Sequence, residues 1–266
     1  WSQSEIMVVR RSDAVESWMF AEHVRRRMRR QGADHAVSVG VSSGDLDEIG
    51  SLLLDAEHAS CLAASRGGNG TCTDRMVMVE RLADEIEFLI GGDPEHRRSV
   101  FLSHAWSELG PGQRHYVDGH CRQVSGASYD LAQSIGLDAD DIEVARLAGL
   151  FHDIGKSVVP ESLLSHEGRL TSGEREIVRH MHEESVRLAG LLGVCPAACR
   201  VIAELGEDAP TTRIARLVRI ADAICAMTSP RTPARIKAMH DAISTLEGDV
   251  RFDAGIVEHV RQRRAA

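Results

Sequence analysis

The sequence predicts an α+β protein, in which a partial α/β unit is joined by a linker helix to an all-α helical bundle. Short Val-rich segments alternate with helical patterns before residue 72. Apolar residues then recur at helical spacing among acids from 73 to 91, and no convincing strand pattern follows residue 94. These observations place the domains at 1–72, 73–97 and 98–266.

Composition narrows the classes of function. The chain has 266 residues, and 31 Lys+Arg against 40 Asp+Glu give a net charge of -9, which disfavours a partner made of nucleic acid polymer. Its longest apolar runs are far shorter than the roughly 20 residues needed to cross a bilayer, and no leader opens the chain. Its 6 cysteines form no disulfide framework. We therefore expect a cytoplasmic protein with reduced thiols and no membrane segment.

The first 72 residues read as strand, helix, strand and helix. The expected ranges are 5–10, 14–31, 35–42 and 46–65, with the glycine cluster at 67–70 as a stop signal. Two strands are too little sheet to stand alone. Because the chain opens in what reads as the middle of a domain, we expect a segment upstream of Trp1.

The segment from 73 to 91 predicts a connecting helix whose apolar stripe lies among acids. Such a stripe is typical of a helix that pairs with a second copy, so we expect a homodimer. Further helical patterns occupy 98–109, 114–135, 140–154, 173–193, 196–205, 212–228, 232–246 and 254–264.

Several segments of the second half carry a family resemblance. Residues 114–124 (RHYVDGHCRQV) resemble the opening helix of HD-family phosphohydrolases, and residues 147–156 (LAGLFHDIGK) resemble the HD-GYP branch, which hydrolyses cyclic di-GMP. Further matching segments follow in order at 131–132, 135–137, 159–160, 163–164, 170–171, 216–223, 227–229 and 252–253. The resemblance covers about 98 to 262 and implies a metal-dependent phosphodiesterase that acts on a cyclic dinucleotide.

The N-terminal part is similar to the second half of a GGDEF domain, the diguanylate cyclase fold, through residues 37–41 and 63–70. The family's signature loop would fall on Ser2, Gln3, Ser4 and Glu5, where serine and glutamine replace the two glycines and serine replaces an acid. Only Glu5 remains of the metal-holding acids. We therefore expect residues 1–72 to be a truncated, degenerate GGDEF-like domain without cyclase activity.

The His-Asp pair at 152 and 153 is the candidate metal site. A step of one residue rotates a helical side chain by about 100°, so both side chains can reach one ion lying off the helix end. The buried approach from Leu147 to Phe151 makes an unpaired charge costly at this point, and a metal ion would neutralise it. Lys156 follows on the same face and points toward a bound phosphate.

The HD-family resemblance completes the expected site. The pattern H…HD…D implies that His120, His152, Asp153 and Asp222 hold one divalent transition metal, Fe or Mn, with positions left open for water and phosphate. Asp153 and Lys156 are then the expected catalytic residues. Lys156 and Arg216 are the expected substrate-binding residues.

The sequence also departs from the HD-GYP pattern. A further ligand histidine of that family falls on Met181, and its neighbours His180 and His182 could replace it only through a local distortion of the helix; both also fit ordinary surface histidines. Between Val201 and Arg216 the family has a His-His-Glu run and a Gly-Tyr-Pro segment, whereas this sequence has only the short stretch 203–212. Either this element was deleted or the sequence given omits it.

Three hypotheses follow. The first is an HD-type phosphohydrolase acting on cyclic di-GMP or a related nucleotide. The second is a non-catalytic signalling module that senses a nucleotide or binds a partner, which the replaced histidine and the altered signature loop favour. The third is a helical adaptor that binds neither metal nor nucleotide, which the buried approach to His152 disfavours.

Overall fold

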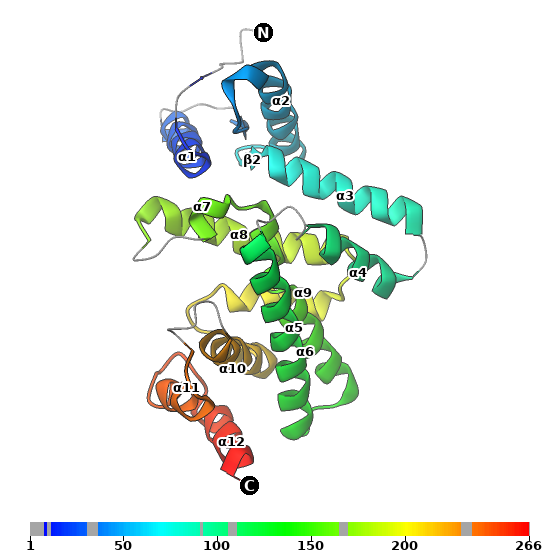
Figure 1. Ribbon diagram of the computed structural model, residues 1–266, viewed down its shortest axis with the longest axis vertical. Helices are drawn as coiled ribbons and strands as arrows, with labels where there is room; N and C mark the ends of the chain where they lie inside the picture. The colour runs from blue at the N-terminus through cyan, green and yellow to red at the C-terminus, as the bar shows by residue number, and fades with distance from the viewer. Residues whose placement is uncertain are drawn as a thin grey trace. The chain divides into compact units, whose positions relative to one another are not determined.

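The computed structural model describes residues 8–9, 12–30, 37–90, 93–105, 111–164, 170–229 and 236–265 (Figure 1). These residues form two compact units. The first unit contains the described residues up to Met78 together with 170–177, and the second contains the described residues from 79 to 164 and from 178 onward.

The first unit has a parallel two-stranded sheet. Helix α1 (Ala14–Arg30) precedes β1 (Val39–Val41), and the chain then runs through the short helix η1 (Leu46–Glu48) and helix α2 (Ile49–Ser65) to β2 (Thr71–Thr73). Strands β1 and β2 pair in parallel, with Val39 opposite Thr71. Helix α2 is therefore the crossover of a β-α-β unit.

Glycines shape this β-α-β unit. A side-chain carbon on Gly40 would lie 1.8 Å from the carbonyl oxygen of Ala56, so only glycine lets α2 pack this closely on β1. The turn after α2 needs positive φ at Gly67, Gly68 and Asn69, as expected for a helix stop. Of the strand expected at 5–10, only Val8 and Val9 are described, and neither lies in a strand. Strand β2 was not predicted.

Helix α3 (Asp74–Ile90) agrees with the expected connecting helix. Its first turn is capped by the Thr73 hydroxyl, which accepts a hydrogen bond from the Met76 amide at 3.3 Å. Met76, Val79, Ala83 and Ile86 form its buried face.

Every described element after α3 is helical, as the sequence predicted for the second half. The bounds are α4 (Pro94–Ala105), α5 (Pro111–Ser134), α6 (Ala139–Phe151), η2 (Ile154–Val158), α7 (Glu161–Leu164), α8 (Ser172–Leu191), α9 (Pro196–Leu205), α10 (Arg213–Thr228), α11 (Met239–Leu246) and α12 (Ala254–Ala265). The four-residue α7 was not predicted. Helix α11 begins at Met239 rather than 232, and residues 230–235 lie outside the described residues.

The core of the second unit is built where α5, α6 and α10 meet. Helix α5 runs beside α6, and α10 packs against both (Figure 1). Close approach of α5 and α6 depends on Gly149, where an added side-chain carbon would lie 3.0 Å from Ser125 Cα. Val124, Phe151 and Leu217 are fully buried in this unit. This packing fixes the three helices relative to one another.

The short connection between α9 and α10 is closed by side chains at its two ends. Glu204 accepts hydrogen bonds from the amides of Thr211 and Thr212, both at 2.8 Å. Arg219 donates to the carbonyl oxygens of Leu205 at 3.1 Å and Asp208 at 2.8 Å, and also to that of Glu207. Backbone groups of the loop from α9 to α10 are therefore hydrogen-bonded by side chains of these two helices.

We expect Arg219→Ala to lower the free energy of unfolding by about 1–2 kcal/mol, because the loop carbonyls lose a charged donor but stay accessible to water. Urea unfolding followed by circular dichroism measures this change. Arg261→Ala, which removes an exposed arginine from α12, is the matched control and should change stability by less than about 0.5 kcal/mol. Equal effects of the two substitutions would show that Arg219 does not hold the loop.

Candidate metal centre

His152 and Asp153 lie between the end of the buried helix α6 and the short 3-10 helix η2. Helix α6 ends at Phe151, the His152 amide still donates to the Ala148 carbonyl at 2.9 Å, and the chain then tightens into η2. Phe151 before the pair and Ile154 after it are fully buried. The pair therefore lies between two buried apolar residues. The sequence predicted the buried approach that ends at Phe151, whereas the burial of Ile154 was not predicted.

The structure brings together residues that are far apart in the sequence. Suitable ligand atoms of His120, His152 and Asp153 all lie within 4.8 Å of one another. His120 comes from α5, while the other two follow α6. Asp222, on α10, joins the same cluster: its Oδ1 lies 2.9 Å from His120 Nε2 and 3.6 Å from His152 Nε2.

The orientation of His152 suits a metal ligand. Its Nδ1 lies 2.8 Å from the Gly149 carbonyl oxygen, which can only accept, so Nδ1 carries a proton and donates it. Nε2 then faces Asp153 Oδ2 at 3.3 Å. This nitrogen is buried and makes no well-formed hydrogen bond to the described residues. A metal-ligating histidine usually donates its other ring N–H to a carbonyl or carboxylate in this way, which fixes the tautomer and the orientation of the ring.

The pKa values of His152, Asp153 and Asp222 are shifted by the charges of their neighbours. Burial alone would lower the pKa of His152, but the carboxylates of Asp153 and Asp222 outweigh it and raise this pKa to about 10. Burial likewise opposes ionisation of Asp153, yet Lys156 and His152 hold the pKa of Asp153 well below its usual range. The pKa of Asp222 is also lowered, because the hydrogen bond from His120 outweighs burial. Without a metal, a proton on His152 therefore takes the place of a cation between the two carboxylates.

The centre is open on one side. The side chains of His120 and His152 are only 3% and 7% exposed, whereas that of Asp222 is 39% exposed. The histidines thus form a buried floor and Asp222 lies at the rim.

Lys156 and Gly155 lie beside the cluster. Lys156 Nζ forms an ion pair with Asp153 Oδ2, and the lysine side chain is 16% exposed. The Gly155 amide donates to Ser185 Oγ at 2.9 Å, and a side-chain carbon on Gly155 would lie 1.9 Å from the Met181 carbonyl oxygen. The glycine therefore allows α8 to approach η2 closely. The hydrogen bond between His152 and the Gly149 carbonyl and the one between the Gly155 amide and Ser185 were not predicted. Neither a backbone carbonyl nor a single buried serine can be recognised from a sequence motif.

The remaining predicted residues lie elsewhere. His180 pairs with Glu183 at 3.1 Å, and His182 Nε2 lies 2.6 Å from the Ile202 carbonyl oxygen, against Gly206. Neither histidine belongs to the metal-ligating group found among the described residues. Arg216 donates to the carbonyls of Pro210 and Thr211 and pairs with Asp253, so it is held away from the cluster. The loop expected at Ser2 to Glu5 lies outside the described residues.

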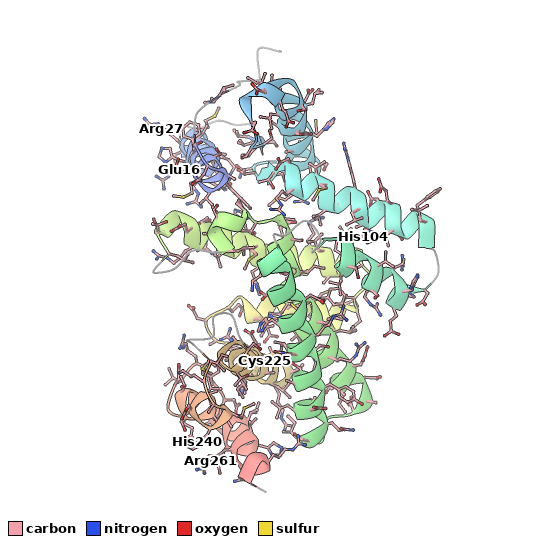
Figure 2. All side chains as sticks on the ribbon, viewed as in Figure 1. Glu16, Arg27, His104, Cys225, His240 and Arg261 are labelled. Carbon is pink, nitrogen blue, oxygen red and sulfur yellow. The ribbon has the colours of Figure 1, made fainter. Side chains whose placement is uncertain are left out.

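The raised pKa of His152 predicts how metal binding depends on pH. A protonated imidazole cannot be a ligand, so a divalent ion must displace this proton at any pH below about 10. We therefore expect metal affinity to rise as pH rises, with release of about one proton per ion near pH 7. Calorimetric titration with Mn²⁺ in buffers of different ionisation enthalpy measures the proton count. His240→Ala, which removes an exposed histidine of α11 (Figure 2), should give the same proton count. Binding without proton release would contradict the assignment.

Three comparisons relate the chain to known proteins. The family model "HD domain" matches residues 117–227. Over 73 residues the chain is 36% identical to the "Cyclic di-GMP phosphodiesterase PA4108" of Pseudomonas aeruginosa; this stretch is 27% of the chain and 18% of that relative's length. The HD domain of the Listeria monocytogenes phosphodiesterase PgpH superposes with a TM-score of 0.46 at 13% identity, covering 60% of this chain and 93% of that one.

Within the described ranges, no helix combines the length and apolar character that crossing a bilayer requires.

The range matched by the family model includes His120, the His152-Asp153 pair and Asp222 on α10. Residues 117–227 of this chain form an HD domain.

Proposed function

We propose that the chain is a metal-dependent phosphodiesterase that hydrolyses cyclic di-GMP or a related nucleotide. The observation that carries this proposal is the buried Nε2 of His152, which faces the carboxylates of Asp153 and Asp222 beside His120. The similarity to a protein named for cyclic di-GMP phosphodiesterase activity supports the substrate class.

The donor set fits a single divalent transition metal. His120, His152, Asp153 and Asp222 would hold it, since two imidazoles and two carboxylates suit Fe²⁺ or Mn²⁺. Such an ion supplies Lewis-acid polarisation of a phosphate oxygen and lowers the pKa of water. Gly149 holds the imidazole of His152 in the tautomer that presents Nε2 to the cluster.

Lys156 is the proposed substrate-contacting residue. Its ammonium group forms an ion pair with Asp153, which places it beside the cluster. A phosphodiester bound nearby would be a second anionic partner for the ammonium group. The phosphate would reach it from the side of Asp222, the most exposed member of the cluster. The lysine then orients the phosphate and balances charge that develops on its oxygens.

The test is hydrolysis by the full chain. We expect the Mn²⁺-loaded protein to convert cyclic di-GMP to a linear dinucleotide, which chromatography separates from the substrate. The metal-free protein is the control and should not convert it. A protein that binds one equivalent of Mn²⁺ and binds cyclic di-GMP, but turns over no substrate, would overturn the phosphodiesterase proposal.

A second candidate function is a nucleotide sensor without catalysis. Only one metal-ligating cluster occurs among the described residues, and His180 and His182 have other contacts. The loop between α9 and α10 is closed on itself by Arg219 and leaves little room for a substrate-shaping segment. Near-zero metal content together with nucleotide binding would favour the sensor over the enzyme.

We infer that residues 1–72 are what remains of a GGDEF-like domain. Its support is the parallel β1-α2-β2 unit and the glycine turn that follows α2. Cyclase activity is not expected, because the sequence at Ser2 to Ser4 lacks the glycines and an acid of the signature loop.

We further propose that two copies pair through the end of α3. Much of the predicted stripe is already buried within the chain, but Phe88 is 88% exposed and Leu89 is 75% exposed. Such neighbouring exposed apolar side chains are typical of a contact surface. We expect light scattering to give a dimer mass for the full chain and a monomer mass for Phe88→Glu. A monomer for the unaltered chain at micromolar concentrations would contradict pairing.

A further inference from the structure

Ser185 on α8 supplies a hydrogen-bond acceptor to the turn that carries Asp153. The serine side chain is fully buried. Its hydroxyl donates to the Met181 carbonyl at 3.3 Å, one turn back on α8, which leaves the lone pairs of the oxygen to accept. This oxygen accepts the Gly155 amide at 2.9 Å. A single side chain therefore joins the backbone of α8 to the start of η2.

This contact takes the place of an ordinary helix cap. The first amides of a helix have no partner within it, and the side chain of the N-cap residue commonly accepts the amide of the second or third helical residue. Asp153 is the N-cap residue of η2 and Gly155 is its second residue, yet the Asp153 side chain makes no cap hydrogen bond. The backbone of Asp153, at φ -108° and ψ 9°, is also not in the extended conformation that is typical of such caps.

The Asp153 carboxylate faces the metal centre instead. Its Oδ2 lies 3.3 Å from His152 Nε2 and pairs with Lys156. Because aspartate is among the best capping residues, this carboxylate has two competing positions, one on the Gly155 amide and one beside His152. Gly155 is buried, so its amide needs an acceptor within the protein. Ser185 is that acceptor, and the carboxylate stays with the cluster.

We propose that Ser185 is a positioning residue of the metal centre. It keeps Asp153 from capping η2 and so keeps the carboxylate turned toward His152. Ser185 acts through the Gly155 amide and is not itself a ligand. The inference rests on the proposed function for the metal centre, but it does not require turnover of a nucleotide.

The first test is the Mn²⁺ affinity of Ser185→Ala, measured from the electron paramagnetic resonance signal of free Mn²⁺. We expect Kd to weaken by about 10–100-fold, the usual effect of losing an outer contact that orients a metal ligand. An unchanged Kd would overturn the inference.

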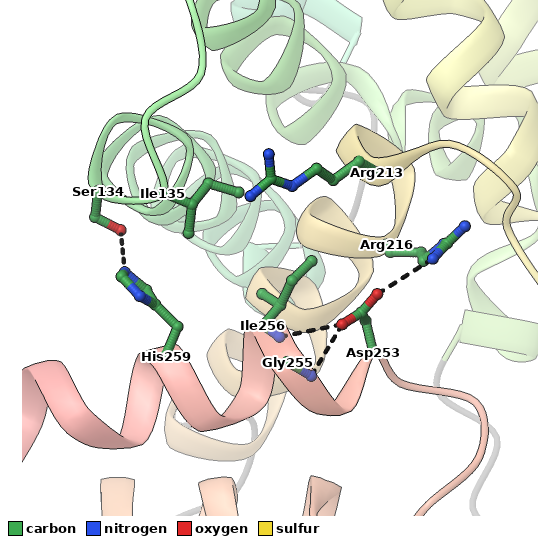
Figure 3. A pocket seen from close by; sticks show the side chains of 8 residues that line it. All are labelled: Ser134, Ile135, Arg213, Arg216, Asp253, Gly255, Ile256 and His259. Atoms are coloured by element: carbon green, nitrogen blue, oxygen red, sulfur yellow. Dashed lines mark hydrogen bonds and ion pairs between the residues drawn. The ribbon is translucent and has the colours of Figure 1, made fainter.

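Ser134→Ala is the matched control. Ser134 is the last residue of α5; its hydroxyl donates to the Leu131 carbonyl at 2.8 Å and lies 3.0 Å from His259 Nε2 (Figure 3). Both variants lose hydrogen bonds within the second unit, so we expect similar shifts of the urea midpoint for the two metal-free proteins. Only Ser185→Ala should weaken Mn²⁺ binding, and an equal loss of affinity in Ser134→Ala would overturn the positioning role.

A crystal structure of metal-free Ser185→Ala is the second test. A buried amide without an acceptor carries its full desolvation cost, so we expect a carboxylate oxygen of Asp153 to turn to the Gly155 amide and away from His152 Nε2. A carboxylate that stays beside His152 in this variant would overturn the inference. This measurement needs neither metal nor substrate. A chain that shows the movement but hydrolyses no cyclic di-GMP would support the positioning role and contradict only the proposed phosphodiesterase activity.

Discussion

Asp153→Asn is expected to abolish retention of the metal ion and to reduce hydrolysis of cyclic di-GMP by about a thousandfold or more. The substitution preserves shape but removes the carboxylate that lies 3.3 Å from His152 Nε2 and pairs with Lys156. Loss of an outer contact of a metal ligand commonly weakens binding 10–100-fold, and loss of a ligand should weaken it more. Elemental analysis of the purified protein measures the first effect, and the initial rate of hydrolysis measures the second.

Asp118→Asn is the matched control for this change. Asp118 lies on α5 only two residues from His120, but it is exposed and pairs with Arg122 at 2.8 Å. Its substitution should leave metal content and hydrolysis within about twofold of the unaltered chain. If Asp153→Asn retained both one equivalent of metal and full turnover, Asp153 would have no part in the centre.

Gly155→Ala is expected to destabilise the second unit by about 3 kcal/mol or more. The added carbon would lie 1.9 Å from the Met181 carbonyl oxygen and 2.9 Å from the Ser185 amide nitrogen, and both are backbone atoms that cannot swing aside. Helix α8 must therefore move away from η2, and the hydrogen bond from the Gly155 amide to Ser185 is lost. Urea unfolding followed by circular dichroism measures the loss.

Gly190→Ala is the control substitution for Gly155→Ala, because Gly190 lies on α8, the helix that Gly155 contacts. Gly190 is an exposed residue of α8 with open space around its α-carbon, so alanine should be neutral or stabilise the helix by up to about 1 kcal/mol. If Gly155→Ala behaved like Gly190→Ala, the close approach of α8 to η2 would not be required by the fold.

The sequence predicted the long helices well because their apolar residues recur at helical spacing over many turns. Helix α6 was expected to reach residue 154, but it ends at Phe151, since the chain tightens into η2 after the His152 cap. Strand β2 has three residues, Thr71 to Thr73, which is too short for an alternating pattern to emerge. Its position depends on pairing with β1, a contact that no local pattern reports.

The candidate site likewise has features that the sequence shows and features that depend on folding. The adjacency of His152 and Asp153 and the buried run before them were visible in the sequence, and the structure places His120 and Asp222 beside them. The roles of His182 and Arg216 could not be read locally, because their partners, the carbonyls of Ile202 and Pro210, are backbone atoms brought near by folding. Spacing alone cannot report which atoms will lie opposite a side chain.

Anomalous diffraction from crystals of the Mn²⁺-loaded full chain tests most directly whether α5, α6 and α10 supply one metal centre. We predict a single strong anomalous peak among His120 Nε2, His152 Nε2 and the carboxylates of Asp153 and Asp222. No peak at this position in Mn²⁺-saturated crystals, or a peak bound instead by His180 or His182, would contradict the account.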